Sequence, residues 1–112
     1  MEFDSNKPIY LQICDGIGEA ILAGTLKEGD RIPSVREYGA EIGVNPNTVA
    51  RSYERLTDTG VIFTKRGLGY FVAEGAKKAV KNAAKKEFLE NEVPAFLHKM
   101  EVLGLTLDDI KV

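Results

Sequence analysis

The stretch from Ser34 to Pro46 carries signals that end one helix and begin another within about three residues. Ser34 and Glu37 have the spacing of a capping box, which begins a helix, and Gly43 can supply the left-handed backbone that ends one. Asn45 is then a good N-cap, and Pro46 suits the first helical position because its φ is preset and it has no amide hydrogen. Two short helices joined in this way form a helix-turn-helix.

The second of these helices is expected to have an apolar face and a polar face. At about 100° per residue, Val49, Tyr53 and Leu56 lie together and should face the core. The opposite face offers amide, hydroxyl and guanidinium groups, which can pair with base edges and phosphates in the major groove of DNA. The residues of this polar face are Asn47, Thr48, Arg51, Arg55 and Asp58.

Two β-rich runs follow, over residues 62–66 and 70–72, with Gly67-Leu68-Gly69 between them. This pattern predicts a hairpin whose tip carries Lys65 and Arg66. A short strand at residues 31–32 would complete a three-stranded sheet. We therefore expect a winged helix-turn-helix domain, mainly α with a small antiparallel sheet, over residues 1–74.

The positive charges are distributed unevenly along the chain. All five arginines lie within residues 30–72, whereas nine of the ten lysines lie outside that range. Each arginine alone could equally be a solvated charge, but the joint clustering favours contact with phosphates and guanine. The net charge of −2 does not exclude a DNA-binding protein, because only the contact surface must be basic.

The composition changes after Val72. Residues 76–86 are mostly alanine and lysine, which form helices well, and these lysines either make a solvated face or touch flanking DNA. From Phe88 onward, apolar residues recur at helical spacing, and Pro94 either kinks one long helix or starts a second one. We expect a C-terminal helical dimerisation arm over residues 75–112.

The apolar stripe of this arm needs a cover, because a lone helix would leave it exposed. The same surface of a second copy is the simplest cover; packing on the winged helix of its own chain is the alternative. A two-fold dimer would place two recognition helices roughly 34 Å apart, one turn of DNA. The residues predicted to form the dimer contact are Phe88, Leu89, Val93, Phe96, Leu97, Met100 and Leu103.

Several classes of site are not expected. Cys14 and His98 are the only cysteine and histidine, too few for a tetrahedral metal site or an oriented Cys-His pair. The Gly67-x-Gly69 motif lies in a hairpin, so it is not a dinucleotide fingerprint. We therefore expect no enzyme, no cofactor and no metal, and read Cys14 as a small apolar filler. No apolar run precedes Lys7 and no stretch is long enough for a membrane span, so we expect a cytoplasmic protein.

The order and spacing of these motifs resemble the GntR family of bacterial transcription regulators, in particular its small YtrA-like branch. The resemblance implies a winged helix that binds a palindromic operator as a homodimer and usually represses transcription. It also implies that the large effector domain of other branches is absent. The motifs that carry it are PIYLQI (residues 8–13), GTL (24–26), GDRIPSVRE (29–37), VNPNTVARSY (44–53) and GLGYFV (67–72).

The resemblance also assigns roles to residues. It implies that Arg36 contacts DNA, that the start of the second helix reads the major groove, and that Gly67 and Gly69 bring the wing tip to the minor groove. Ala50 stands where many members have arginine, and the YtrA-like branch has that arginine one place on, at Arg51. The full set of predicted DNA contacts is Ser34, Arg36, Asn45, Asn47, Thr48, Arg51, Ser52, Arg55, Lys65, Arg66, Gly67 and Gly69.

The main functional prediction is a sequence-specific DNA-binding transcriptional regulator, with repression as its expected effect. The alternative is a winged-helix protein–protein interaction module that holds a partner through residues 47–55. Affinity for DNA falls steeply with salt, so binding that is insensitive to salt would favour the alternative. The sequence leaves open whether a small-molecule effector binds between the arm and the winged helix.

Overall fold

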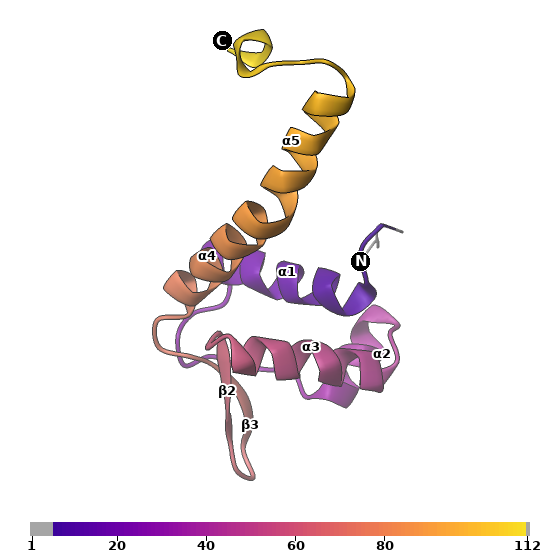
Figure 1. Ribbon diagram of the computed structural model, residues 1–112. Coiled ribbons are helices and arrows are strands. Elements are labelled where there is room, and N and C mark those ends of the chain that lie inside the picture. The colour runs from indigo at the N-terminus through magenta and orange to yellow at the C-terminus, as the bar shows by residue number, and fades with distance from the viewer. Residues whose placement is uncertain (1–5, 112) are drawn as a thin grey trace. The chain divides into compact units, whose positions relative to one another are not determined.

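The computed structural model describes residues 6–111 of the 112-residue chain. It is mainly helical with one small antiparallel sheet, as predicted (Figure 1). The chain divides into two compact units, residues 1–80 and 81–112, called here the winged unit and the tail. The elements are α1 (Ile9–Leu22), β1 (Arg31–Ile32), α2 (Val35–Ile42), α3 (Pro46–Asp58), β2 (Ile62–Lys65), β3 (Gly69–Val72), α4 (Ala76–Glu87), η1 (Phe88–Glu92), α5 (Val93–Val102) and η2 (Leu107–Ile110).

The predicted signals at the start and end of α2 are confirmed. The Ser34 hydroxyl accepts a hydrogen bond from the Glu37 amide, and the Glu37 carboxylate accepts one from the Ser34 amide, both at 3.1 Å. Gly43 ends the helix with φ +71°. Two of the unpaired amides at the beginning of α2 therefore have side-chain acceptors, which stabilises the entry to the helix-turn-helix.

The turn between α2 and α3 is tight enough to demand a glycine inside α2. The Val44 amide donates to the Gly39 carbonyl at 2.9 Å. A Cβ at Gly39 would lie 2.6 Å from the Val44 carbonyl oxygen, closer than real contacts allow. Asn45 then caps α3, because its side-chain oxygen accepts from the Asn47 amide at 2.8 Å. The close crossing of α2 and α3 depends on this absence of a side chain.

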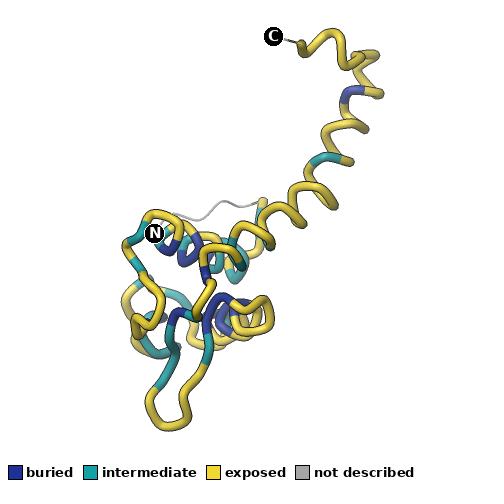
Figure 2. The backbone as a smooth tube through the Cα atoms, turned by 90° about the vertical axis from the view of Figure 1, so that its left-hand side faces the viewer, coloured by how far each residue is buried: buried dark blue, intermediate teal, exposed yellow. Residues whose placement is uncertain are grey.

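The core of the winged unit lies between α1, α3 and the inner face of the sheet, and its residues are dark blue in Figure 2. Tyr53 is fully buried at its centre, where its hydroxyl donates to the Pro33 carbonyl at 2.7 Å. Burial raises the pKa of Tyr53, so this hydroxyl stays a donor at neutral pH. The buried cluster is Ile13, Ile17, Ile21, Ile32, Val49, Tyr53, Leu56, Val61, Ile62, Val72 and Ala76.

The sheet has the order β1-β3-β2, with both pairs antiparallel. The expected strand at Arg31–Ile32 is present, and Arg31 pairs with Phe71 across the ladder. Lys65 pairs with Gly69 at the end of the hairpin, which leaves Arg66, Gly67 and Leu68 as the tip of the wing. Within the winged unit, the hairpin extends away from α1, α2 and α3 in Figure 1.

In the tail, the helical segments continue without a break through Pro94, but the turn that precedes it is not a regular α-helix. A π-helical turn, η1, joins α4 to α5, and Pro94 lies in the first turn of α5. The Val93 amide donates to the carbonyl of Phe88, five residues back. Proline has no amide hydrogen and its ring crowds the preceding turn, so a wider turn before it relieves that conflict. Among residues 6–111, no helix is long and apolar enough to cross a membrane.

Candidate nucleic-acid interface

The polar face predicted for the second helix lies on the surface of α3. Asn47, Arg51 and Arg55 are exposed and Thr48 is half-buried. No hydrogen bond or ion pair joins the side chain of Arg51 or Arg55 to any other residue within 6–111. Their guanidinium donors are therefore available to a ligand that supplies acceptors, such as phosphate oxygens or the edge of guanine.

Asn45 has a structural role in addition to the predicted one. Its side-chain oxygen is used to cap α3. The amide nitrogen of the same side chain keeps two donors, and the residue is exposed. Asn45 can thus fix the start of α3 and still present donors at its surface.

Two other groups of predicted contacts lie on separate elements of the same unit. Arg36 is exposed on α2, and Lys65, Arg66 and Gly67 are exposed at the wing. The Lys65 ammonium lies 5.0 Å from the centre of the Phe71 ring. The winged unit therefore carries exposed positive charge on α2, α3 and the β2–β3 hairpin.

The structure removes Ser52 from the predicted contacts. Its side chain is fully buried, and its hydroxyl donates to the Tyr10 carbonyl at 2.7 Å. The hydroxyl also lies 3.3 Å from the Thr48 carbonyl oxygen. The prediction that Ser52 contacts DNA is wrong, because α1 covers the side of α3 on which Ser52 lies.

Arg31 was not among the predicted contacts, but it holds the wing tip. Its Nε donates to the Leu68 carbonyl at 3.1 Å, and its Nη2 lies 4.0 Å from the Glu37 carboxylate. Hydrogen bonds from the Ser34 amide and hydroxyl lower the pKa of Glu37, so this partner stays ionised. Gly69 has φ +111°, a backbone conformation that L side chains rarely adopt, and a Cβ there would also lie 3.3 Å from the Arg31 Nε. The arginine clustering was visible in the sequence, whereas this pairing was not.

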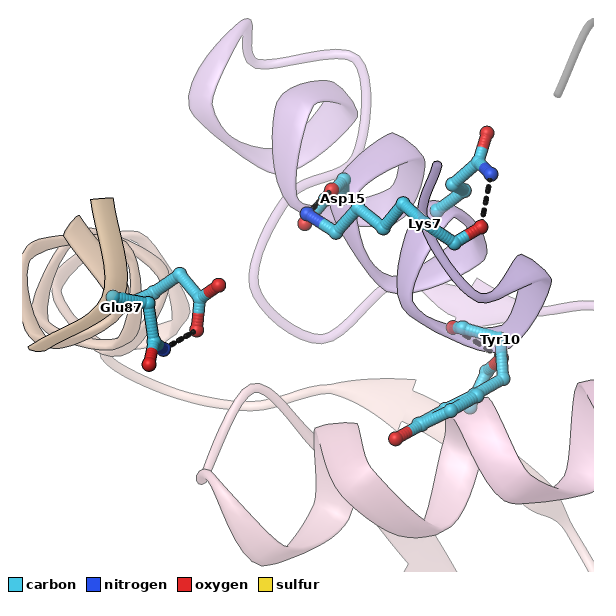
Figure 3. A network of polar contacts seen from close by, with 7 residues as sticks. Lys7, Tyr10, Asp15 and Glu87 are labelled. Atoms are coloured by element: carbon cyan, nitrogen blue, oxygen red, sulfur yellow. Dashed lines mark hydrogen bonds and ion pairs between the residues drawn. The ribbon is translucent and has the colours of Figure 1, made fainter. Parts of the chain in front are cut away.

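A second contact that the sequence did not reveal joins α1 to α3. The guanidinium carbon of Arg51 lies 3.9 Å from the centre of the Tyr10 ring. Figure 3 shows Tyr10 extending from α1 alongside α3, with its carbonyl bonded to a residue of that helix. Tyr10 belongs to the PIYLQI motif, but nothing in the local spacing indicates which residue its ring meets.

Cys14 is half-buried on α1, packs against the core and donates to the Ser52 carbonyl at 3.4 Å. Burial raises the pKa of its thiol to about 11. This position confirms its reading as a small filler. Among residues 6–111, no group of three or more His, Cys, Asp or Glu side chains could hold a metal ion.

The tail leaves most of the predicted dimer stripe exposed. Val93 is half-buried, while the exposed members are Phe88 (53%), Leu89 (64%), Phe96 (51%), Leu97 (48%) and Leu103 (61%). Met100 is the exception at 6%, so a partner could not cover it and its place in the stripe is a wrong prediction. There the chain turns at Gly104, and the Leu105 amide donates back to the Met100 carbonyl at 2.8 Å. The sequence stripe missed four further exposed apolar residues, Val102, Leu105, Leu107 and Ile110.

Comparison with known proteins gives consistent matches. Residues 9–72 match the model of the gntR family of bacterial regulatory proteins. YhcF of Bacillus subtilis, an HTH-type transcriptional regulator, is 40% identical over 111 residues, which cover 97% of this chain and 88% of YhcF. The HTH-type transcriptional repressor YtrA of the same species is 47% identical over 73 residues, covering 65% of this chain and 56% of YtrA.

Two solved structures extend these matches to the fold and to DNA. A transcriptional regulator of the GntR family from Bacteroides thetaiotaomicron has a TM-score of 0.74 at 48% identity, over 91% of this chain and 88% of that one. The DNA-binding domain of AraR, solved in complex with operator ORR3, has a TM-score of 0.58 at 29% identity, over 65% of this chain and 86% of that one.

Proposed function

This chain belongs to the GntR family of bacterial regulatory proteins, in its YtrA-like branch, as a DNA-binding transcriptional regulator, and we propose that it represses transcription as a homodimer on a palindromic operator. The recognition helix is α3, which enters the major groove, and the wing approaches the adjacent minor groove. Since its target is DNA, the protein acts in the cytoplasm. Repression is the activity named for the relative YtrA.

The main support for the proposed DNA-reading face of α3 is its pair of exposed arginines, Arg51 and Arg55. Neither has an acidic partner within residues 6–111. Arg51 lies in the second turn of a helix that begins at Pro46, near the end that reaches into a groove. Asn47 precedes it on the same exposed side. This face combines the amide and guanidinium groups that distinguish adenine and guanine from other bases.

The proposed dimer is supported by the exposed apolar side chains of the tail. Two copies that share this surface would bury side chains which one copy leaves in water. A two-fold dimer matches a palindrome, because each half of the operator then meets an identical helix. Binding of one half-site raises the effective concentration of the second reader at the other.

The test uses DNA from the intergenic region beside the gene, searched for an inverted repeat and labelled for fluorescence anisotropy. We expect Arg51→Ala to cost about 1–3 kcal/mol in operator affinity, and Arg36→Ala to add to that loss. Lys27→Ala is the matched control, because Lys27 is an exposed cation of the winged unit outside the proposed interface. All variants should keep the circular dichroism spectrum of the unaltered protein.

Two outcomes would contradict the proposal. Unchanged operator affinity in the Arg36→Ala, Arg51→Ala double variant would show that the reading face is wrongly assigned. Tight binding that does not weaken between low and moderate salt would instead indicate the protein–protein module, because release of counterions makes DNA binding salt-dependent.

A further inference from the structure

We propose that Tyr10 is a positioning residue for DNA recognition, which holds the Arg51 guanidinium against its ring and leaves that group's hydrogen-bond donors free for the operator. The inference rests on the proposed role of Arg51 in reading DNA. It adds a residue of α1, outside the helix-turn-helix and the wing, to the parts of the chain that determine operator affinity.

The backbone of Tyr10 is fixed to α3 by buried polar contacts. Its carbonyl accepts the Ser52 hydroxyl at 2.7 Å, and Ser52 is fully buried. One turn further along α1, the Cys14 thiol donates to the Ser52 carbonyl at 3.4 Å. Both contacts appear on the side of α1 that faces α3, and Figure 3 shows the Tyr10 ring leaving the helix at this place. The backbone from which the Tyr10 ring extends is therefore held close to Arg51, which directly precedes Ser52.

The entry to α1 is also held in place. Lys7 forms an ion pair with Asp15, and the Lys7 carbonyl accepts the Gln12 side-chain amide at 2.7 Å (Figure 3). These contacts span the first two turns of the helix that carries Tyr10. They tie the residue before the helix to side chains of its first two turns, at the end where the ring is attached.

The contact of Arg51 with this ring uses a different part of the guanidinium from the part that binds DNA. The Arg51 guanidinium carbon lies 3.9 Å from the ring centre, well inside the range of a cation–π contact. Such a contact covers a face of the planar group, whereas its N–H donors point outward in the plane. A carboxylate partner would occupy those same donors. The ring can therefore order the side chain without competing with phosphate or guanine.

Arg31 provides the contrast within the same unit. Its Nε donates to the Leu68 carbonyl and its Nη2 lies 4.0 Å from the Glu37 carboxylate, so the edge of its guanidinium already contacts acceptors of the protein itself. Arg31 holds the wing tip in this way, while Arg51 is held by a ring and stays free to bind. Ordering a long side chain in advance removes part of the entropy cost that binding would otherwise carry.

The test is a double-mutant cycle on operator affinity, measured by fluorescence anisotropy with the full-length protein and the operator DNA that it binds. We expect Tyr10→Leu to weaken binding about three- to tenfold, because the ring is lost. Tyr10→Phe should stay within about twofold, since the face of the ring is kept. In the Arg51→Ala background the further effect of Tyr10→Leu should be below about twofold, and in the Arg36→Ala background its full effect should remain.

Each other result overturns the inference. Equal losses from Tyr10→Leu in both arginine backgrounds would mean that Tyr10 acts only on the fold. An unchanged operator affinity in Tyr10→Leu, with a clear loss in Arg51→Ala, would rule out the positioning role of Tyr10 and leave the proposed function intact. No loss in Arg51→Ala would rule out both the role of Tyr10 and the role of Arg51 in reading DNA, while the proposed function would still be tested by the Arg36→Ala, Arg51→Ala double variant and by the salt dependence. If Tyr10→Leu does not fold by circular dichroism, Tyr10→Met takes its place, because a flexible methionine fills similar space without a ring.

Discussion

The winged unit and the tail differ in the kind of side chain that they leave in water. Apart from Met100, every buried hydrophobic residue in the described part of the chain lies in the winged unit, whose exposed surface carries unpaired arginines. The tail does the reverse: it has almost no buried side chain and exposes phenylalanine and leucine along its length (Figure 2). The winged unit thus has a complete core within one chain, whereas the apolar side chains of the tail stay exposed, which is the basis of the proposed dimer.

The largest expected effect comes from making the tail polar. Phe96→Asp with Leu97→Asp should convert the proposed dimer to a monomer, because charges cannot be buried unpaired in an apolar contact. Operator affinity should then fall about 10²- to 10⁴-fold, since two half-sites are no longer held by one molecule. Light scattering after size exclusion gives the mass, and anisotropy gives the affinity.

Leu68→Asp is the control for the mass measurement only, because the wing tip lies in the proposed DNA interface. Leu68 is 62% exposed, but it lies at the wing tip and not in the tail, so its substitution should leave the dimer intact. A dimer that persists in the Phe96→Asp, Leu97→Asp variant would show that the tail stripe is not the contact between copies.

The next effect concerns the completeness of the core. Ile13→Ala removes a fully buried side chain and should lower the free energy of unfolding by about 2–5 kcal/mol, through lost burial and a residual cavity. Ile9→Ala is the control on the same helix, because Ile9 is 43% exposed and should cost far less. Urea titrations followed by circular dichroism measure both. Equal losses at the two positions would mean that α1 does not pack as the structure shows.

The smallest effect concerns Cys14 and pH. Burial raises the pKa of its thiol to about 11, so the folded protein keeps the thiol protonated at pH values where the unfolded chain ionises. This contribution to stability is present below the ordinary thiol pKa and declines as pH rises toward 11. Alkylation of Cys14 at pH 8 should be about 100-fold slower in the folded than in the unfolded chain. A Lys111→Cys variant, exposed in the tail, provides the ordinary rate, and equal rates would contradict the burial of Cys14.

The sequence predicts best the features that depend on residues close to each other in the chain. The capping box of Ser34 and Glu37, the left-handed Gly43 and the cap at Asn45 each involve hydrogen bonds or backbone angles within a few positions. Local chemistry alone decides them, so the boundaries of α2 and the start of α3 were predictable. The hairpin was equally clear from its glycines.

The features that failed or were missed depend on packing between distant segments. Ser52 lies three residues after Val49 and four before Leu56, so periodicity places it beside the apolar face, and the position of α1 shows that its hydroxyl is buried. The contacts of Arg31 with Leu68 and of Tyr10 with Arg51 likewise join elements far apart in sequence. Met100 fits the apolar stripe by spacing, yet the turn at Gly104 makes its surroundings different from those of its neighbours.

The π-helical turn at Phe88–Glu92 has a consequence for how the tail tolerates changes in length. In a regular helix each residue advances the axis by about 1.5 Å and rotates the chain by about 100°. A one-residue deletion in this turn would hardly shorten the arm, but it would point Phe96 and Leu97 in a new direction relative to Phe88 and Leu89. In homologous arms of different length, the number of residues in this turn should therefore be constant. Insertions and deletions should occur elsewhere in the arm and in whole helical turns, so that the apolar side chains on both sides of the turn keep the same relative direction.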